Sequence, residues 1–180
     1  MSLQSTYKDT VAPTLMGEFG VKNIFALPRI EKVVINVGAA EALSSKEVLA
    51  KIKEQIAVIA GQEPRVTEAK KSISTFKLKE GDPIGVMVTL RGKKAWDFLD
   101  KFGKIVAPRI RDFRGLPDDK FDAHGNYSFG MTEQILFPQI DYSKVDKVRG
   151  LVFTIVIKNS NREKSKRLLE LLGLPFVKKA

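Results

Sequence analysis

Cysteine is absent from this 180-residue chain, and histidine occurs once, at position 124. Without cysteine the protein can form no disulfide bond, thiolate zinc site or iron–sulfur cluster, and it has no thiol nucleophile. A single histidine also excludes a metal site built from several imidazoles. We therefore expect neither a metal nor a cofactor.

Long apolar runs are missing as well. The longest stretch, LVFTIVI at 151–157, is interrupted by Thr154 and is too short to span a bilayer. The first ten residues, MSLQSTYKDT, contain no apolar segment after a basic end, so no signal peptide is visible. These absences predict a soluble cytoplasmic protein without a membrane partner.

Motifs of enzymes are also lacking, because the chain contains no GxxxxGK[ST], GxGxxG or GxSxG pattern. One candidate remains, in which Asp118, Asp119 and Asp122 would hold Mg²⁺ and His124 would serve as a general base. These residues lie in a proline-containing loop that also carries Lys120, and acidic residues of such loops usually face solvent. We predict that the protein is not an enzyme.

Positive charge is abundant. The chain has 31 lysines and arginines against 21 acidic residues, which gives a net charge of +10. Lysine and arginine displace the counterions condensed on phosphates, so this excess predicts a polyanionic partner. A basic surface that merely keeps the protein soluble is the alternative.

Local periodicity predicts helices at about 7–19, 45–60, 93–106 and after Asn161, which would cap the last one. Pro13 must bend or shorten the first helix, and Pro108 should stop the third. Ser44 and Glu47 form a capping-box pattern at the start of the second. Strands are predicted at about 32–37, 65–68, 84–91, 127–131 and 151–158, and 133–148 should be a loop with one helical turn.

These elements predict an α+β fold, a two-layer sandwich with a mainly antiparallel sheet of about five strands and helices on one face. The strand at 65–68 should pair with that at 84–91, and 127–131 with 151–158. The free face would carry Asn36, Thr89 and Arg91, as in RNA-recognition modules, whose sheet is the reading surface. The chain should form a single domain, 1–180.

Two segments stand out chemically. Lysines, hydroxyl groups and one aromatic ring, suited to phosphate contact, gather in a loop with Gly81 and Gly85 as flexible ends. A merely solvated charged hairpin is the alternative. The residues are Lys70, Lys71, Ser72, Ser74, Phe76, Lys77, Lys79 and Gly81. The irregular stretch PRIRDFRGLPDDKFDAHGNYSFG, 108–130, suits either an active site or a docking surface.

Five ordered blocks carry a resemblance to a known family: LPRIEKVVINVG, KKSISTFKLKEGDPIGVMVTLRG, PRIRDFRGL, FDAHGNYSFGMTEQILFPQIDY and VDKVRGLVFTIV. From about residue 7 to residue 176, the chain resembles the family of the fifth protein of the large ribosomal subunit. This resemblance implies attachment of 5S rRNA in the central protuberance, beside 23S rRNA and other proteins of that region. It favours a docking surface over an active site for 108–130.

The resemblance also assigns roles to residues. The rRNA-binding set is Arg29, Lys32, Asn36, Gly38, Gln62, Thr89, Arg91 and Ser128. The basic loop, at about 70–83, would be mobile and approach peptidyl-site tRNA. Loops at about 108–125 and 133–148 would meet a protein of the small-subunit head in an intersubunit bridge, through Arg109, Arg111, Asp112, Phe113, Arg114, Asp141, Lys144, Asp146 and Lys147.

Three positions depart from the family pattern. Ala123 and His124 stand where a glycine and an arginine are common, and Met87 stands where a lysine is frequent. A phosphate contact by that arginine is therefore either lost or made pH-dependent through His124. A free-standing RNA-binding regulator with the same sheet is the alternative function, and it would not sediment with the large subunit.

Overall fold

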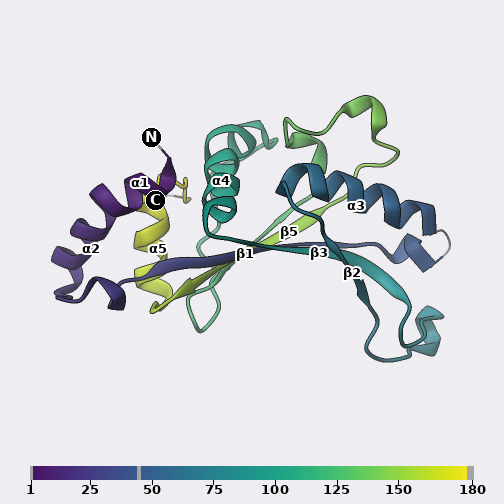
Figure 1. Ribbon diagram of the computed structural model, residues 1–180, viewed down its shortest axis with the longest axis horizontal. Coiled ribbons are helices and arrows are strands. Elements are labelled where there is room, and N and C mark those ends of the chain that lie inside the picture. Colours follow the sequence, from purple (N-terminus) through teal and green to yellow (C-terminus); the bar gives the residue numbers. More distant parts are fainter. Residues whose placement is uncertain (1, 44–45, 178–180) are drawn as a thin grey trace. The chain divides into compact units, whose positions relative to one another are not determined.

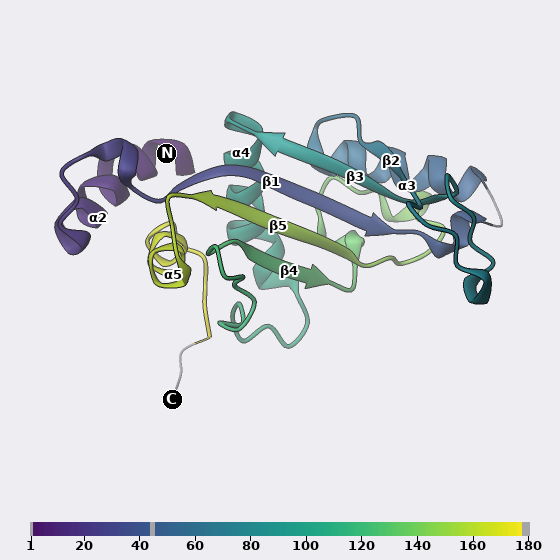
Figure 2. The same cartoon turned by 90° about the horizontal axis from the view of Figure 1, so that it is seen from below.

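The computed structural model describes residues 2–43 and 46–177. In this part of the chain one sheet has the strand order β2-β3-β1-β5-β4 (Figures 1 and 2). Its strands are β1 Arg29–Gly38, β2 Arg65–Glu68, β3 Pro83–Arg91, β4 Tyr127–Met131 and β5 Leu151–Lys158. The α-helices are α1 Leu3–Thr6, α2 Ala12–Phe19, α3 Lys46–Ala60, α4 Lys93–Lys101 and α5 Arg162–Leu171.

The chain divides into two compact units. Unit 1 comprises Met1–Val33, Arg91–Phe129 and Thr154–Ala180, and unit 2 comprises Val34–Leu90 and Gly130–Phe153. The single domain expected from the sequence stays a prediction.

Strand pairing follows the sequence prediction. β2 runs antiparallel to β3, with Arg65 opposite Met87 and Thr67 opposite Gly85, and the register shifts after Thr67. β4 lies beside β5, as predicted, and β1 lies between β3 and β5. The predicted fold class is confirmed, because the chain forms an antiparallel five-stranded sheet with helices packed on it.

In unit 2, α3 supplies the apolar cover of the sheet. Ile52, Ile56 and Ile59 recur at helical spacing and are all at most 2% exposed. Gly61 ends the helix in a left-handed conformation, φ 62°, and its N–H donates to the Ala57 carbonyl at 2.8 Å. The predicted capping residue Ser44 lies outside the described residues.

In unit 1, the N-terminal helical segment begins at Leu3, earlier than predicted, because Ser2 accepts a hydrogen bond from the Ser5 N–H. Pro13 has no N–H to donate to the carbonyl four residues before it. The backbone accommodates this with a π-helical turn, Tyr7–Val11, closed by a bond from the Ala12 N–H to the Tyr7 carbonyl. The proline therefore widens the helix locally.

The third predicted helix continues past its expected end. A π-helical turn, Phe102–Val106, and a 3₁₀ turn, Ala107–Arg109, follow α4. Pro108 lies inside this last turn instead of stopping the helix before it, because a proline in a first turn needs no N–H partner. The predicted inward residues Trp96, Leu99, Phe102 and Val106 are all buried.

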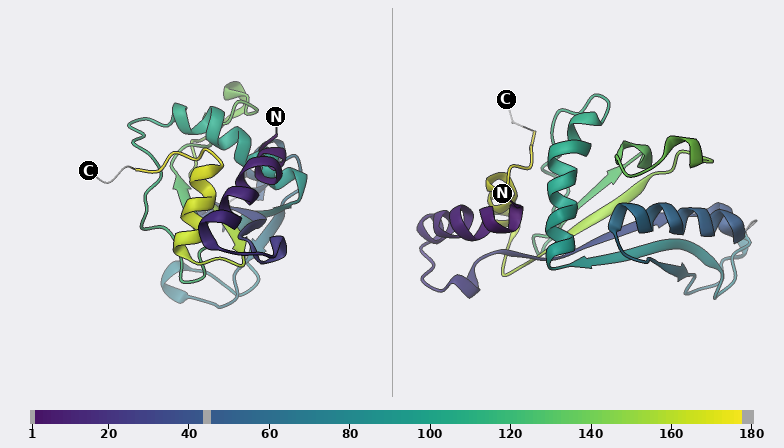
Figure 3. Two further views of the ribbon diagram at one scale, coloured as in Figure 1. Left: turned by 90° about the vertical axis from the view of Figure 1, so that its left-hand side faces the viewer. Right: turned by 45° about the horizontal axis from the view of Figure 1, so that its top comes forward.

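Helix α5 begins as predicted, with the Asn161 side chain accepting from the Lys164 N–H at 2.9 Å. Leu168, Leu169 and Leu172 are buried. Arg167 joins α5 to α2 through a hydrogen bond to Glu18 at 2.8 Å, and the two helices lie side by side (Figure 3).

Candidate nucleic-acid interface

The sheet of unit 2 exposes uncharged polar groups on the side away from its buried residues. On β1, Asn36 and Gly38 are exposed, whereas Ile35 and Val37 are buried. Thr89 is half-buried on the neighbouring strand β3. A side chain built at Gly38 would meet no atom within 4 Å, so the space beside it is open. This face can receive a ligand without moving the backbone.

Gln62 reaches this region from the turn after α3. Its Nε2 atom donates to the carbonyl oxygen of Thr89 at 3.1 Å, although 27 residues separate the two. The bond holds the amide of Gln62 against β3 and ties the end of α3 to the sheet. Two of the predicted rRNA-binding residues, Gln62 and Thr89, are thus in direct contact.

Gly85 has a structural reason for its small size. A Cβ atom there would lie 2.7 Å from the Val37 carbonyl oxygen and 2.9 Å from Thr67 Oγ1. Both distances are shorter than real Cβ contacts allow, so glycine lets β3 approach β1 and β2 closely.

Unit 1 holds the other predicted rRNA-binding residues. Arg29 and Arg91 are exposed, and Lys32 is half-buried. Ser128 on β4 is exposed, and its hydroxyl lies 2.9 Å from the Thr154 hydroxyl on β5. Thr154 was not among the predicted residues, although the alternation of LVFTIVI places it on the polar side of its strand.

The basic loop is closed by hydrogen bonds between its own backbone groups. At its base the Ala69 N–H donates to the Asp82 carbonyl at 2.8 Å, and the Gly81 N–H donates to the Ala69 carbonyl at 2.9 Å. Nearer the tip, the Ile73 N–H donates to the Leu78 carbonyl at 2.8 Å, and the Leu78 N–H donates to the Ile73 carbonyl at 3.1 Å. These bonds form a short hairpin, and its predicted mobility stays a prediction.

The tip of this hairpin presents an aromatic ring to solvent. Ser74–Phe76 forms a 3₁₀ turn, and Lys77 follows in the left-handed region with φ 52°. Phe76 is 69% exposed and Ile73 is 42% exposed. The predicted phosphate-contacting residues Lys70, Lys71, Ser72, Ser74, Lys77, Lys79 and Gly81 are all exposed too. The hairpin therefore projects its charges and one ring away from the core.

The residues predicted for the intersubunit bridge fall in both units. In unit 1, Arg109, Arg111 and Arg114 are exposed, Phe113 is half-buried, and Asp112 has φ 54°. In unit 2, the Asp141 carboxylate accepts from the Ser143 N–H at 3.0 Å and so caps a 3₁₀ turn, Tyr142–Lys144. A joint surface of the two loops stays a prediction.

Asp146 and Lys147 are engaged within the protein. Asp146 accepts two hydrogen bonds from Arg149, and Lys147 Nζ lies 2.6 Å from a carboxylate oxygen of Glu41. The Arg149 hydrogen bonds hold the pKa of Asp146 far below its ordinary value. Sequence analysis missed Glu41, because no local pattern links residues 106 positions apart.

Gln134 completes this polar cluster. It is 2% exposed, and its Nε2 atom donates to the Lys147 carbonyl at 2.7 Å, while its Oε1 atom accepts from the Arg149 N–H. The Gln134 N–H also donates to the Arg149 carbonyl at 3.0 Å. The segment 146–149 is therefore fixed by a buried amide at one side and by Glu41 at the other.

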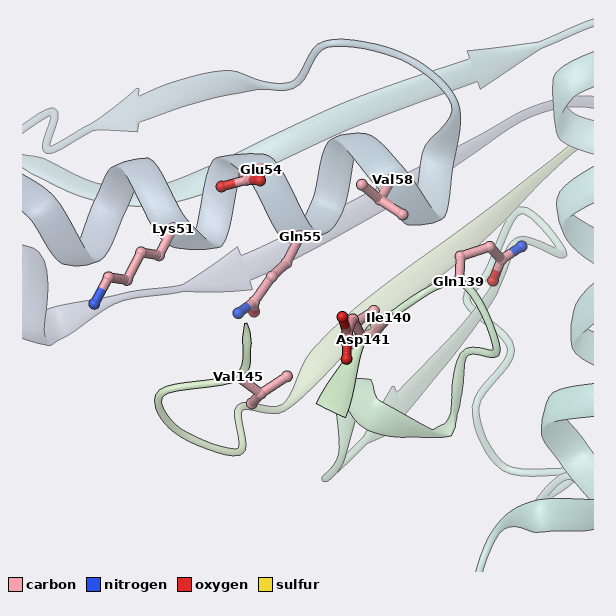
Figure 4. Close-up of a pocket in the computed structure, with 8 residues that line it drawn as sticks. All are labelled: Lys51, Glu54, Gln55, Val58, Gln139, Ile140, Asp141 and Val145. Carbon is pink, nitrogen blue, oxygen red and sulfur yellow. The ribbon is translucent and has the colours of Figure 1, made fainter. Parts of the chain in front are cut away.

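A groove of about 340 Å³ runs between the outer side of α3 and residues 139–145. Figure 4 shows Gln55 directed from α3 toward the segment that carries Val145. Lys51, Glu54 and Asp141 bring charges of both signs to its walls. Val58, which lines the groove, is 48% exposed, and Tyr142, the residue after Asp141, is 75% exposed. Mixed charge around apolar groups suits a protein partner better than a phosphate backbone.

The acidic loop that suggested Mg²⁺ binding uses its carboxylates internally. Asp122 accepts from the backbone N–H groups of His124 and Asn126 at 2.9 and 2.7 Å. Burial acts to raise the pKa of Asp122, but hydrogen bonds from Asn126 outweigh it and keep that pKa below its ordinary value. Asp118 pairs with Lys166 at 3.0 Å. Within residues 2–43 and 46–177, no cluster of three or more such ligands could hold a metal.

In the same part of the chain, no helix has the length and apolar character needed to cross a bilayer.

Comparison with known proteins identifies the family. Residues 23–79 match the model of ribosomal protein L5, and residues 83–176 match the model of the C-terminus of the same ribosomal family. The large ribosomal subunit protein uL5 of Thermus aquaticus is 50% identical over 99% of this chain and 98% of its own length. The uL5 proteins of Symbiobacterium thermophilum and Thermoanaerobacter sp. (strain X514) are 49% and 48% identical, over 99% and 98% of each chain.

These matches confirm the resemblance, the absence of enzymatic activity and the predicted location in the cytoplasmic ribosome. They favour a ribosomal component over a free-standing regulator. The chain belongs to the ribosomal protein L5 family, and it is a structural constituent of the large ribosomal subunit.

Proposed function

We propose that the protein attaches 5S rRNA in the central protuberance through the exposed sheet face of unit 2. The observation that supports this most is the group of uncharged polar residues on that face, Asn36 and Thr89, with Gln62 bonded to the Thr89 carbonyl. Amide and hydroxyl groups on an open sheet can form hydrogen bonds with base edges and 2′-hydroxyls. Lysines that pair with phosphates do not distinguish one RNA sequence from another. The polar residues of the sheet face therefore give the contact its selectivity.

Charge supplies the remaining attraction. A net charge of +10 favours encounter with any RNA, and Arg29, Lys32 and Arg91 would pair with phosphates from unit 1. Ser128 and Gly38 would contact the RNA closely, because one is a small hydroxyl and the other has no side chain. The contact extends to 23S rRNA and to neighbouring proteins of the central protuberance.

The basic hairpin at about 70–83 contacts peptidyl-site tRNA in this proposal. Its four lysines and its hydroxyl groups match a phosphate backbone, and exposed Phe76 at the tip adds an apolar contact. Because the stem is closed by its own backbone bonds, the tip can adjust to the tRNA without disturbing the sheet.

The loops at about 108–125 and 133–148 dock a protein of the small-subunit head and so form an intersubunit bridge. The groove beside α3, with charges of both signs and exposed Val58 in its wall, supports a protein partner for the second loop. Arg109, Arg111 and Arg114 offer carboxylates a matching surface in the first loop.

The test is a titration of purified 5S rRNA against the wild-type protein and Asn36→Ala. Loss of a well-placed hydrogen bond costs ~1–3 kcal/mol, so the variant should bind roughly ten- to a hundred-fold more weakly. An unrelated RNA of equal length should show no difference between the two proteins. If Asn36→Ala bound 5S rRNA as wild type does, the sheet face would not be the recognition surface.

A further inference from the structure

A 3₁₀ turn, Ile24–Ala26, connects α2 to β1 in unit 1 (Figure 1). Two adjacent apolar side chains of this turn are exposed. Ile24 is 53% exposed and Phe25 is 72% exposed. Single exposed apolar residues are common, but an aromatic ring presented this fully at a turn is not explained by packing. The fold and the proposed rRNA contacts described above make no use of it.

The ring stands on a rigid support. The Asn23 side chain accepts from the Phe25 N–H at 2.9 Å, and the Ala26 N–H donates to the Asn23 carbonyl at 3.0 Å. From the end of β5, Asn159 Nδ2 donates to the Phe25 carbonyl at 2.6 Å. Directly after the turn, Leu27 is fully buried. These bonds fix the backbone that carries Phe25, so a ligand there has to order only the ring.

Asn159 is itself placed for this contact. It follows the last residue of β5 with φ 57°, a left-handed conformation that asparagine tolerates better than most residues. The bond to Phe25 spans 134 positions of the sequence. Within unit 1 it therefore joins the segment Gly20–Ile30 to the segment Thr154–Arg162.

The charge of these two joined segments has one sign. They contain Lys22, Arg29, Lys158 and Arg162, and the nearest acidic residues, Glu31 and Glu163, lie just beyond their ends. All four cations are exposed. A protein-docking patch usually mixes charges, as the groove beside α3 does, whereas an exposed ring among cations is complementary to a base and its phosphates.

We propose that Phe25 is a stacking platform for an unpaired rRNA base, with Lys22 and Lys158 holding the adjoining phosphates. This inference rests on the proposed rRNA-binding function and adds to it a contact outside the sheet. Aromatic rings stack on any base, and proteins recognise RNA largely at such splayed-out, single-stranded nucleotides. Ile24 covers the edge of the stacked base.

The experiment compares Phe25→Ala, Phe25→Leu and Phe25→Trp in separate titrations of 5S rRNA and 23S rRNA at several salt concentrations. Stacking on one side chain is worth roughly a five- to hundred-fold change in affinity, and Phe25→Ala and Phe25→Leu should both lose it on one of the two RNAs. Phe25→Trp should retain binding, and RNA should quench its added fluorescence relative to the wild type. The salt dependence should stay unchanged, because no charge is removed.

Altered folding should not confound this test, since an exposed side chain can be replaced without loss of core, and thermal melting should be equal for all four proteins. Asn159→Ala is a second probe, which leaves the ring in place but removes its support. It should weaken binding to the same RNA by a smaller factor than Phe25→Ala.

Three results would overturn the proposal. Phe25→Ala could bind both RNAs as wild type does, or Phe25→Leu could bind normally, which would indicate simple apolar contact. Phe25→Ala could also bind RNA normally but enter large subunits poorly, which would assign the ring to a protein neighbour. Asn36→Ala, measured in the same titrations, separates these outcomes from a failure of the proposed sheet-face contact.

Discussion

The guanidinium group of Arg149 donates one hydrogen bond to each carboxylate oxygen of Asp146, at 2.8 and 2.9 Å. Arg149 is 9% exposed, whereas Asp146 lies at the surface, so the forked pair holds a buried guanidinium at its outer end. Glu41 Oε2 lies 3.6 Å from the same guanidinium. The segment 146–149 is therefore organised around a cation of the protein itself, which changes how its role in docking must be tested.

Asp146→Asn should lower the free energy of unfolding by about 1–3 kcal/mol, since it removes a charged partner from a buried arginine. Urea denaturation measures the change. Asp112→Asn, which alters an exposed aspartate of the other docking loop, is the matched control and should change stability little. Equal effects of the two substitutions would show that the pair with Arg149 does not stabilise the fold.

The same pair makes stability depend on pH. Arg149 holds the folded pKa of Asp146 below its ordinary value of 3.8, so the stabilisation is complete above pH 3.8 and is lost as the pH falls toward the folded pKa. The urea midpoints of wild type and Asp146→Asn should therefore differ fully at about pH 6 and converge on acidification below pH 3.8. A difference that grew on acidification would contradict this sign.

Docking of the small-subunit protein is better tested away from that pair. Val58 lines the groove, and Tyr142 follows Asp141, another lining residue. Both are well exposed, so Tyr142→Ala and Val58→Ser should leave the melting temperature nearly unchanged. Both should weaken subunit joining, measured by sedimentation of reassociated subunits, because they remove apolar contact area. Their affinity for 5S rRNA should stay within a few-fold of wild type, and a parallel loss of RNA binding would refute the separation of roles.

Shortening the basic hairpin, by replacing residues 71–79 with a glycine-containing turn, should leave thermal stability nearly intact. The bonds between Ala69, Gly81 and Asp82 that close its base are kept, and Ile73 and Phe76 contribute little to the core. Retention of tRNA in the peptidyl site should fall. A collapse of the melting transition would mean that half-buried Leu78 is a core residue.

Salt dependence can separate recognition from attraction. Asn36→Ala should reduce 5S rRNA affinity with an unchanged salt slope, whereas Arg91→Ala should reduce affinity and flatten the slope by about one contact. Lys77→Ala, in the hairpin, should barely affect 5S rRNA binding. If Asn36→Ala bound 5S rRNA normally and Lys77→Ala bound it weakly, the hairpin would be the 5S rRNA site and the sheet face would not.

The strands were predictable because apolar and polar residues alternate along them, and this alternation follows which side chains are buried. β2, β4 and β5 begin and end at the predicted residues, since alternation and flanking turn residues mark them locally. The pairing of Glu41 with Lys147 and Arg149 was not predictable, because charged residues so far apart in sequence leave no periodic trace. The internal partners of Asp146 and Lys147 were therefore not predicted, and the part of these two residues in docking stays a prediction.

The candidate interface also has features that the sequence predicts and features that it does not. Asn36 and Thr89 follow from strand alternation, which places them on the exposed side. The bond from Gln62 to the Thr89 carbonyl depends on how α3 enters β2, and single-sequence patterns do not describe such a turn. The support of Phe25 by Asn159 is equally hidden, because it joins two segments that fold together only in the complete sheet.

The irregular register of β2 affects the protein before it meets RNA. β2 is the outer strand next to β3, is only four residues long, and loses its regular pairing after Thr67. Its ends carry exposed Arg65 and Glu68. A short, charged, interrupted edge is a poor template for another chain, so a newly made molecule is protected on that side from edge-to-edge aggregation while it waits for assembly.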